Sequence, residues 1–422
     1  MLKEEYLVNK VYKTNRKKLK LPTLGFTLVE LLAVVVILGI ILTIAVPRIM
    51  DVIDNTRESA YEINEGMMVS AARNYLVMNE SKNPSEPGTM SILTIEELQN
   101  SELISSINDA KDSNIDCDGY VVVKNVNGTA FDYTPYLKCG TNYETEGFIF
   151  QHLQSVDVLV VAGGGSGASE SSSCETVMSG AGGAGGLIFL EKIEVTGLTS
   201  IEIGAGGVAP NNSGQDSKFG NFIAIGGGHG GRNNLVSGDG GSSGGGGRGC
   251  SGNPSQGAVG ESQQPSSISG GYGNLGGGST GLCGCPSYVS GGGGAGTKGT
   301  TEGYGGDGMY YGSIFGNKFG ENGWFAGGGG ARPSSGGGIG GGGNGSLFNQ
   351  PGDNGLPNTG GGGGGGITAH RGYPAGNGGS GVVLVKYEGP PKAIGGEITS
   401  FNGYTIHAFT EVGESVFEVL EF

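Results

Sequence analysis

The motif of this sequence that most resembles a ligand-binding site is a group of small residues that follows an apolar run. Val156–Val161 is rich in β-branched residues, and Gly163, Gly165 and Ala168 follow it in a G-x-G-x-x-A register. In a dinucleotide-binding fold, such glycines let the backbone approach a pyrophosphate at the N-terminus of a helix. Residues 169–186 have no apolar period and many serines and glycines, which disfavour a helix. An enzyme that uses this fingerprint is therefore an alternative that a helix after Ala168 would favour.

Other residue types that catalyse reactions or bind metals are scattered. The histidines lack metal-ligand spacing: His152, His229, His370 and His407. Four cysteines lie in the glycine-rich region: Cys174, Cys250, Cys283 and Cys285. They allow three pairings, and Cys283 and Cys285 are too close together to bridge easily, so each is expected to pair with Cys174 or Cys250. Outside the cytosol, disulfides are expected rather than a zinc site. The sequence therefore predicts no catalytic residues, no cofactor and no metal.

A single carboxylate, Glu30, lies where a charge is costly. Residues 26–46 are apolar apart from Glu30 and two threonines. At about 1.5 Å per residue they span about 30 Å, the thickness of a bilayer core. Residues 1–25 hold seven Lys and Arg residues, which favour the cytoplasmic side. A membrane anchor alone does not explain Glu30, because a carboxylate in lipid costs up to a few kcal/mol and needs a partner.

At these residues the chain resembles the type IV prepilins. The resemblance covers a basic leader that ends in Gly25, then Phe26, and Glu30 four residues further on. Gly39 within the apolar helix and Pro47 after it also fit the family. The resemblance implies cleavage between Gly25 and Phe26 by a prepilin peptidase and methylation of the new amine. It also implies that Glu30 offsets the Phe26 amine of a neighbouring pilin subunit, since opposite charges in lipid stabilise each other strongly.

Residues 26–80 are expected to form one long helix, because apolar residues recur at three- and four-residue steps beyond Pro47. The head of residues 81–147 follows a break at residues 83–88. Thr94 and Glu97 have the spacing of a capping box. Two strands are expected around the turn at residues 127–128. Cys117 and Cys139 lie at the open ends of that hairpin and are expected to form a disulfide, with two unrelated buried thiols as the alternative. Pilin heads commonly carry a similar hairpin and disulfide.

Glycine dominates the next region: all but 13 of the 92 glycines lie within residues 163–381. A flexible Gly/Ser linker is one interpretation, but apolar strand signals bound the region at 156–161 and 381–388. Collagen is excluded, because glycine does not recur at every third residue. We therefore expect extended glycine segments that pack backbone to backbone and satisfy one another's N–H and C=O groups.

Residues 156–386 resemble the glycine-rich domains of phage tail-fibre tips and some bacterial surface proteins. The resemblance lies in VDVLVVAGGG, IGAGG, FGNFIAIGGG and NGGSGVVLVKY, and implies a polyglycine sandwich whose loops recognise receptors. The densest aromatic cluster between the glycine tracts is a candidate ligand surface, most simply for a glycan or a cell-envelope component: Tyr304, Tyr310, Tyr311 and Trp324. Packing on the lattice is the alternative role for such aromatics. The acidic balance beyond residue 25 disfavours nucleic acid as a partner.

The tail predicts two strands, at 404–410 and 415–421, after a linker signal at 389–396. In related glycine-rich modules such a pair usually precedes the first strand, so we expect the tail to fold back beside Val156–Val161 and complete that sheet.

The expected fold is an α+β pilin-like head on a long N-terminal helix, plus a glycine-rich all-β or polyglycine II-type module. The expected domains are a leader (1–25), a transmembrane and pilin helix (26–80), a head (81–147), a glycine-rich module (148–388) and a linker with a strand pair (389–422). The expected protein is no enzyme but a minor or tip pilin subunit. It would be inserted in the cytoplasmic membrane as a single-pass precursor and then displayed at the cell surface with an adhesive module. The alternative is a pseudopilin of a type II secretion or DNA-uptake machine.

Overall fold

A computed structural model describes residues 27–145, 153, 155–169, 177–232, 236–247, 259–278, 289–333, 335–347, 350–368 and 373–420. The chain divides into two compact units, Met1–Glu62 and Ile63–Phe422.

The long helix α1 (Leu28–Met78) runs through Pro47 without a break, which confirms the helix expected over residues 26–80. The large apolar side chains from Leu28 to Ile53 are exposed. By length and composition this helix can cross a membrane, and it is the one helix among the described residues that can do so.

The head, residues 63–145, combines the C-terminal part of α1 with a short helix and strands. Its elements after α1 are η1 (Glu80–Lys82), β1 (Thr89–Thr94), α2 (Ile95–Asn100), β2 (Asp118–Asn125), β3 (Phe131–Cys139) and β4 (Tyr143–Glu144). The predicted capping box is present: the Glu97 amide donates to Thr94 Oγ1 and the Thr94 amide donates to Glu97 Oε2, both at 3.2 Å. The predicted hairpin is also present, since β2 and β3 pair from Asp118↔Lys138 to Asn125↔Phe131.

Two sheets contain the longer strands of residues 155–420, and the first of them also contains the strands of the head. The first has the strand order β4-β3-β2-β1-β16-β17-β14-β5-β7, and the second has the order β10-β9-β8-β18-β15. The new strands are β5 (Ser155–Val161), β7 (Leu187–Glu194), β8 (Leu198–Ile203), β9 (Ser217–Phe219), β10 (Phe222–Ala224), β14 (Val382–Glu388), β15 (Ala393–Ile394), β16 (Glu397–Phe401), β17 (Tyr404–Phe409) and β18 (Gly413–Val419). A buried apolar cluster joins the two sheets and includes Val158, Val383, Ile201 and Phe417.

The glycine-rich part also contains shorter elements. They are β6 (Val177–Met178), η2 (Gln264–Ser266), β11 (Met309–Tyr310), α3 (Gly312–Phe315), β12 (Trp324–Phe325) and β13 (Ile367–Thr368). Strands β6 and β13 pair with each other, as do β11 and β12.

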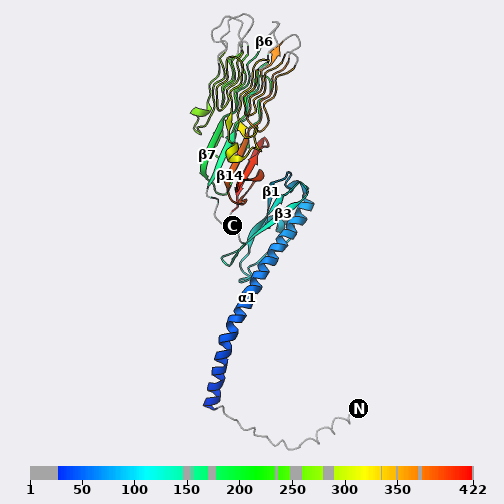
Figure 1. Ribbon diagram of the computed structural model, residues 1–422, viewed down its shortest axis with the longest axis vertical. Coiled ribbons are helices and arrows are strands. Elements are labelled where there is room, and N and C mark those ends of the chain that lie inside the picture. Colours follow the sequence, from blue (N-terminus) through cyan, green and yellow to red (C-terminus); the bar gives the residue numbers. More distant parts are fainter. Residues whose placement is uncertain are drawn as a thin grey trace, which may run out of the picture. The chain divides into compact units, whose positions relative to one another are not determined.

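Between the sheets and β6, extended segments of residues 162–381 lie side by side; we call them the glycine lattice (Figure 1). Their hydrogen bonds repeat every three residues. The amides of Ala162, Gly165 and Ala168 donate to the segment of residues 180–186, while those of Gly163 and Ser166 donate to residues 212–215. The amides of residues 164 and 167 donate to residues 376–379. Successive amides thus point in three directions, as in a helix with three residues per turn.

The lattice requires glycine because its segments approach too closely for side chains. A Cβ built on Gly182 would lie 2.0 Å from the carbonyl oxygen of Gly165, and one on Gly292 would lie 1.9 Å from that of Gly182. Several non-glycine residues of these segments are small and buried, among them Ser166, Ala181 and Ala184.

The tail strands differ from the expected arrangement. Strand β17 joins the sheet of β5, but it pairs with β14 and β16 and lies one strand away from Val156–Val161. Strand β18 pairs with β8 in the second sheet. The two tail strands therefore enter different sheets and do not form a pair. The segment expected as a linker also contributes strand β15.

Candidate functional site

The aromatic segment of residues 309–325 supplies most of the residues expected to bind a ligand. Strands β11 and β12 pair in the register Met309↔Phe325 and Tyr310↔Trp324. Helix α3 and a loop lie between these strands. The segment covers one face of the first sheet, because Phe315, Phe319 and Phe325 pack with side chains of β5, β14 and β17.

Tyr311 is part of this packing. Its side chain is 6% exposed, and its ring lies 5.0 Å from that of Phe189. Burial raises the pKa of its phenol. Tyr310 ends strand β11, whereas Tyr311 is the N-cap residue of helix α3, so the two neighbours have different backbone conformations. Tyr311 therefore does not belong to an exposed recognition surface.

Tyr310 and Trp324 form an accessible aromatic pair. Tyr310 is 44% exposed and Trp324 is half-buried. Their ring centroids are 5.4 Å apart and the planes are inclined by 45°. The Tyr310 hydroxyl donates to Asn317 Oδ1 at 3.0 Å, which fixes the tyrosine ring. Asn317 was not a predicted site residue. It lies seven residues after Tyr310, and no sequence pattern predicts its contact with that tyrosine.

Tyr304 is exposed but lies elsewhere. The amides of Gly305, Gly306 and Gly308, which follow it, bond to neighbouring lattice segments. At about 3.1 Å per residue, the six residues from Tyr304 to Tyr310 span roughly 19 Å. Among the predicted ligand residues, the structure therefore brings together only Tyr310 and Trp324 as accessible side chains.

The G-x-G-x-x-A motif is part of the lattice. Every amide from residue 163 to residue 168 donates to a carbonyl or side chain of another segment. Residues 162–169 are extended, and residues 170–176 lie outside the described part of the chain. The amides that would cradle a pyrophosphate are thus already bonded, which overturns the dinucleotide interpretation.

Comparison with known proteins gives one result. Residues 144–388 match the glycine-rich domain family over more than half of the chain. The chain belongs to this glycine-rich domain family. No curated protein and no solved structure is significantly similar to it.

Glu30, which precedes the glycine-rich domain, takes part in a second capping box. The Thr27 amide and hydroxyl donate to Glu30 Oε2 at 2.9 and 2.8 Å, and the Glu30 amide donates to Thr27 Oγ1 at 3.3 Å. The T-x-x-E spacing at the start of α1 is a signal for this contact that the sequence analysis did not use. Gly25 and Phe26, the predicted processing residues, lie outside the described residues, whereas Pro47 lies within α1.

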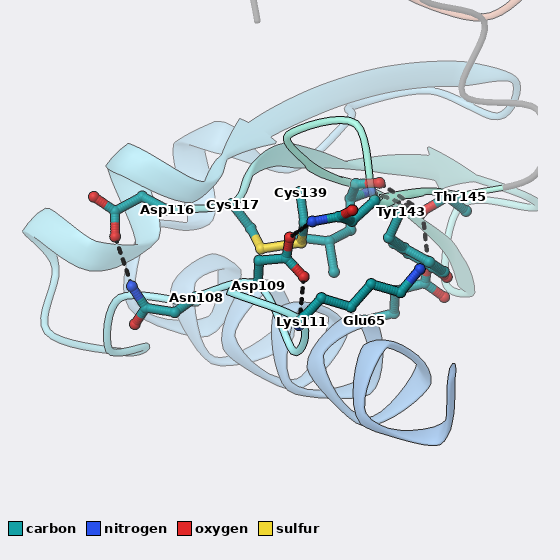
Figure 2. Close-up of a disulfide and its surroundings, with 11 residues drawn as sticks. Glu65, Asn108, Asp109, Lys111, Asp116, Cys117, Cys139, Tyr143 and Thr145 are labelled. Atoms are coloured by element: carbon teal, nitrogen blue, oxygen red, sulfur yellow. Dashed lines mark hydrogen bonds between the residues drawn. A yellow bond between two sulfur atoms is a disulfide. The ribbon is translucent and has the colours of Figure 1, made fainter. Parts of the chain in front are cut away.

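The head contains the predicted disulfide between Cys117 and Cys139, which confirms that pairing (Figure 2). Figure 2 also shows two carboxylates that tie the surrounding segments together. Glu65 of α1 accepts from the hydroxyls of Tyr143 and Thr145. Asp109, which is buried, accepts from the Lys111 amide and from the Asn142 side chain.

The remaining cysteines and histidines provide no metal site within the described residues. Cys174, Cys250, Cys283 and Cys285 lie outside those residues, as do His152 and His370. His229 bonds to the carbonyl of Gly230. His407 is buried between β14 and β16 and bonds to Tyr387 and Gly395.

Proposed function

We propose that this protein is a pilin-like subunit, minor or at the tip of a filament, that displays its glycine-rich domain at the cell surface as an adhesive module. The precursor would insert α1 in the cytoplasmic membrane. A prepilin peptidase would then cleave it between Gly25 and Phe26, and it would assemble with other pilin subunits. The exposed apolar first half of α1 and the glycine-rich domain are compatible with such a surface-displayed protein.

The lattice is the observation that carries the adhesive role. Its interior amides and carbonyls bond to one another, as for Gly182, Gly183 and Gly363. Interaction with another molecule must therefore use side chains at the surface of the lattice. Because the backbone holds these side chains in fixed positions, binding costs little ordering entropy.

We propose the Tyr310–Trp324 pair as the ligand surface and a glycan or cell-envelope component as the ligand. Aromatic rings offer a flat apolar face with low conformational entropy, which suits recognition. The proposed ligand is not nucleic acid, because the chain has 39 acidic and 24 basic residues. We also propose that the protein is not an enzyme, since the G-x-G-x-x-A motif, which is typical of dinucleotide-binding enzymes, is hydrogen-bonded into the lattice.

Alanine substitutions test the ligand surface. Purified full-length protein in detergent would be applied to a glycan array and to target cells. We expect Tyr310→Ala and Trp324→Ala each to weaken binding at least tenfold while the melting curve changes little. Tyr304→Ala is the matched control, because Tyr304 is an exposed aromatic at the other end of its glycine tract.

The outcome pattern separates the alternatives. Unfolding of both variants would show that these rings are packing residues. Loss of binding only in Tyr304→Ala would move the ligand surface to the other end of the tract. Immunogold labelling of isolated filaments tests display separately: absence from filaments, with retention at the cell envelope, would favour the pseudopilin alternative.

A further inference from the structure

The edge of the head sheet is covered by a strand from the far end of the chain. Strand β1 pairs with β16 in the register Thr89↔Thr399 and Met90↔Ile398. About 300 residues separate these partners along the sequence. The contact joins the strands of the head to those of the glycine-rich domain within one sheet.

Apolar contacts extend this junction. Ile398 is 4% exposed and packs in a cluster with Ile92, Tyr120 and Val122 of the head. Ile394 and Leu420, also from the tail, pack against the same cluster. The tail therefore buries apolar side chains that the head strands would otherwise present to water.

Polar contacts orient the junction. The hydroxyl of Tyr120, a head residue, donates to the Pro391 carbonyl at 3.1 Å. Lys318, from the aromatic segment, contacts Glu86 of the head at 2.9 Å and Glu397 of β16 at 2.5 Å. These ion pairs are partly exposed, so they contribute to orientation more than to stability.

The same tail is held firmly by the glycine-rich domain. Strand β17 pairs with β14 from Val383↔Phe409 to Glu388↔Tyr404, and β18 pairs with β8 from Gly413↔Ile203 to Glu418↔Leu198. Phe417 is fully buried between the sheets. Strands β17 and β18 of the tail thus pair with strands of the glycine-rich domain. Strand β16, Ile394 and Leu420 instead pack against the head.

We propose that residues 391–420 are a strap that fastens the head to the glycine-rich domain and completes the apolar face of the head. The strap makes the head dependent on a segment that follows the glycine-rich domain in the sequence. It also makes the glycine-rich domain an insertion between two parts of one folded unit, rather than an appendage on a finished head.

Hydrogen exchange on the full-length protein in detergent tests the strap. Ile398→Asn places a polar side chain in the head cluster and leaves the β17–β14 and β18–β8 pairings in place. We expect exchange of the amides in β1 and β2 to accelerate at least tenfold, while the amides of residues 162–168 keep their protection. Ser400→Asn is the control, because Ser400 is exposed on the same strand and should change neither region.

Two results would overturn the proposal. Unchanged protection of β1 and β2 in Ile398→Asn would show that the head is complete without the strap. Equal acceleration in the head and in residues 162–168 would show that Ile398 supports the glycine-rich domain itself.

Discussion

His407 is a fully buried polar residue, and both of its ring nitrogens have hydrogen-bond partners. Its Nδ1 donates to the Gly395 carbonyl at 2.7 Å and its Nε2 accepts from the Tyr387 hydroxyl at 2.8 Å. The Tyr387 oxygen in turn accepts from the Lys392 amide. Burial lowers the pKa of His407 from 6.5 to about 4. The neutral ring is therefore part of the folded strap.

This pair predicts a pH dependence of stability. The unfolded chain binds a proton at His407 below pH 6.5, whereas the folded chain does so only near pH 4. The contribution of the neutral ring is complete above pH 6.5 and is lost as the pH falls toward 4, by about 3 kcal/mol in total. Urea unfolding between pH 7 and pH 4 measures it.

His407→Gln is the control for that measurement, because glutamine can donate and accept but does not titrate in this range. Subtracting its pH profile from that of the native chain removes the contribution of the carboxylates. Identical slopes for the two proteins would contradict the assignment.

Some secondary-structure elements of the protein follow from local sequence patterns, and the placement of others depends on tertiary contacts. The long helix, the capping box at Thr94, the hairpin and the disulfide follow local patterns, and each could be predicted from sequence. The two tail strands were also predicted, and β17 joins the expected sheet. The pairing of β16 with β1 and the entry of β18 into the second sheet could not be predicted, because tertiary contacts between distant segments decide them. The burial of Tyr311 beside the exposed Tyr310 could not be predicted either, because it depends on the packing of Tyr311 against Phe189.

The close approach of lattice segments predicts the effect of a single methyl group. Gly182→Ala would place a Cβ 2.0 Å from the Gly165 carbonyl oxygen, within a segment bonded on several sides. We expect a loss of about 3 kcal/mol or more in the free energy of unfolding of the glycine-rich domain. Thermal unfolding followed by calorimetry measures this loss.

Gly336→Ala is the matched control, since the nearest atom to its added Cβ is Asn344 Oδ1 at 3.6 Å, an ordinary contact. We expect a change within about 0.5 kcal/mol. Equal melting temperatures for the two variants would refute the claim that interior segments require glycine.

At the scale of the whole molecule, the chain joins an apolar helix, a disulfide-bonded head and a lattice built from backbone. Glu30, at the start of the apolar helix, has two candidate roles. The carboxylate completes a capping box with Thr27, and the proposed pilin function would give it an assembly role as well. These two roles make different demands on the side chain.

The Glu30 variants separate the two roles. Intact mass of surface material should show a chain that begins at methylated Phe26, and retention of residues 1–25 would end the pilin assignment. Glu30→Gln keeps a capping side chain but removes the charge, whereas Thr27→Val removes the cap and keeps the charge. We expect both to be cleaved, with only Glu30→Gln incorporated poorly into filaments. Normal incorporation of Glu30→Gln would limit the residue to capping.

The three-residue repeat of the lattice also restricts how its sequence can change in length. One residue inserted after Gly182 would rotate every later amide of that segment by about 120° and direct it to the wrong neighbour. Three inserted residues would complete a turn and restore every direction. Insertions and deletions within the glycine tracts should therefore be tolerated in multiples of three, so the tracts carry a reading frame of their own at the level of the folded backbone.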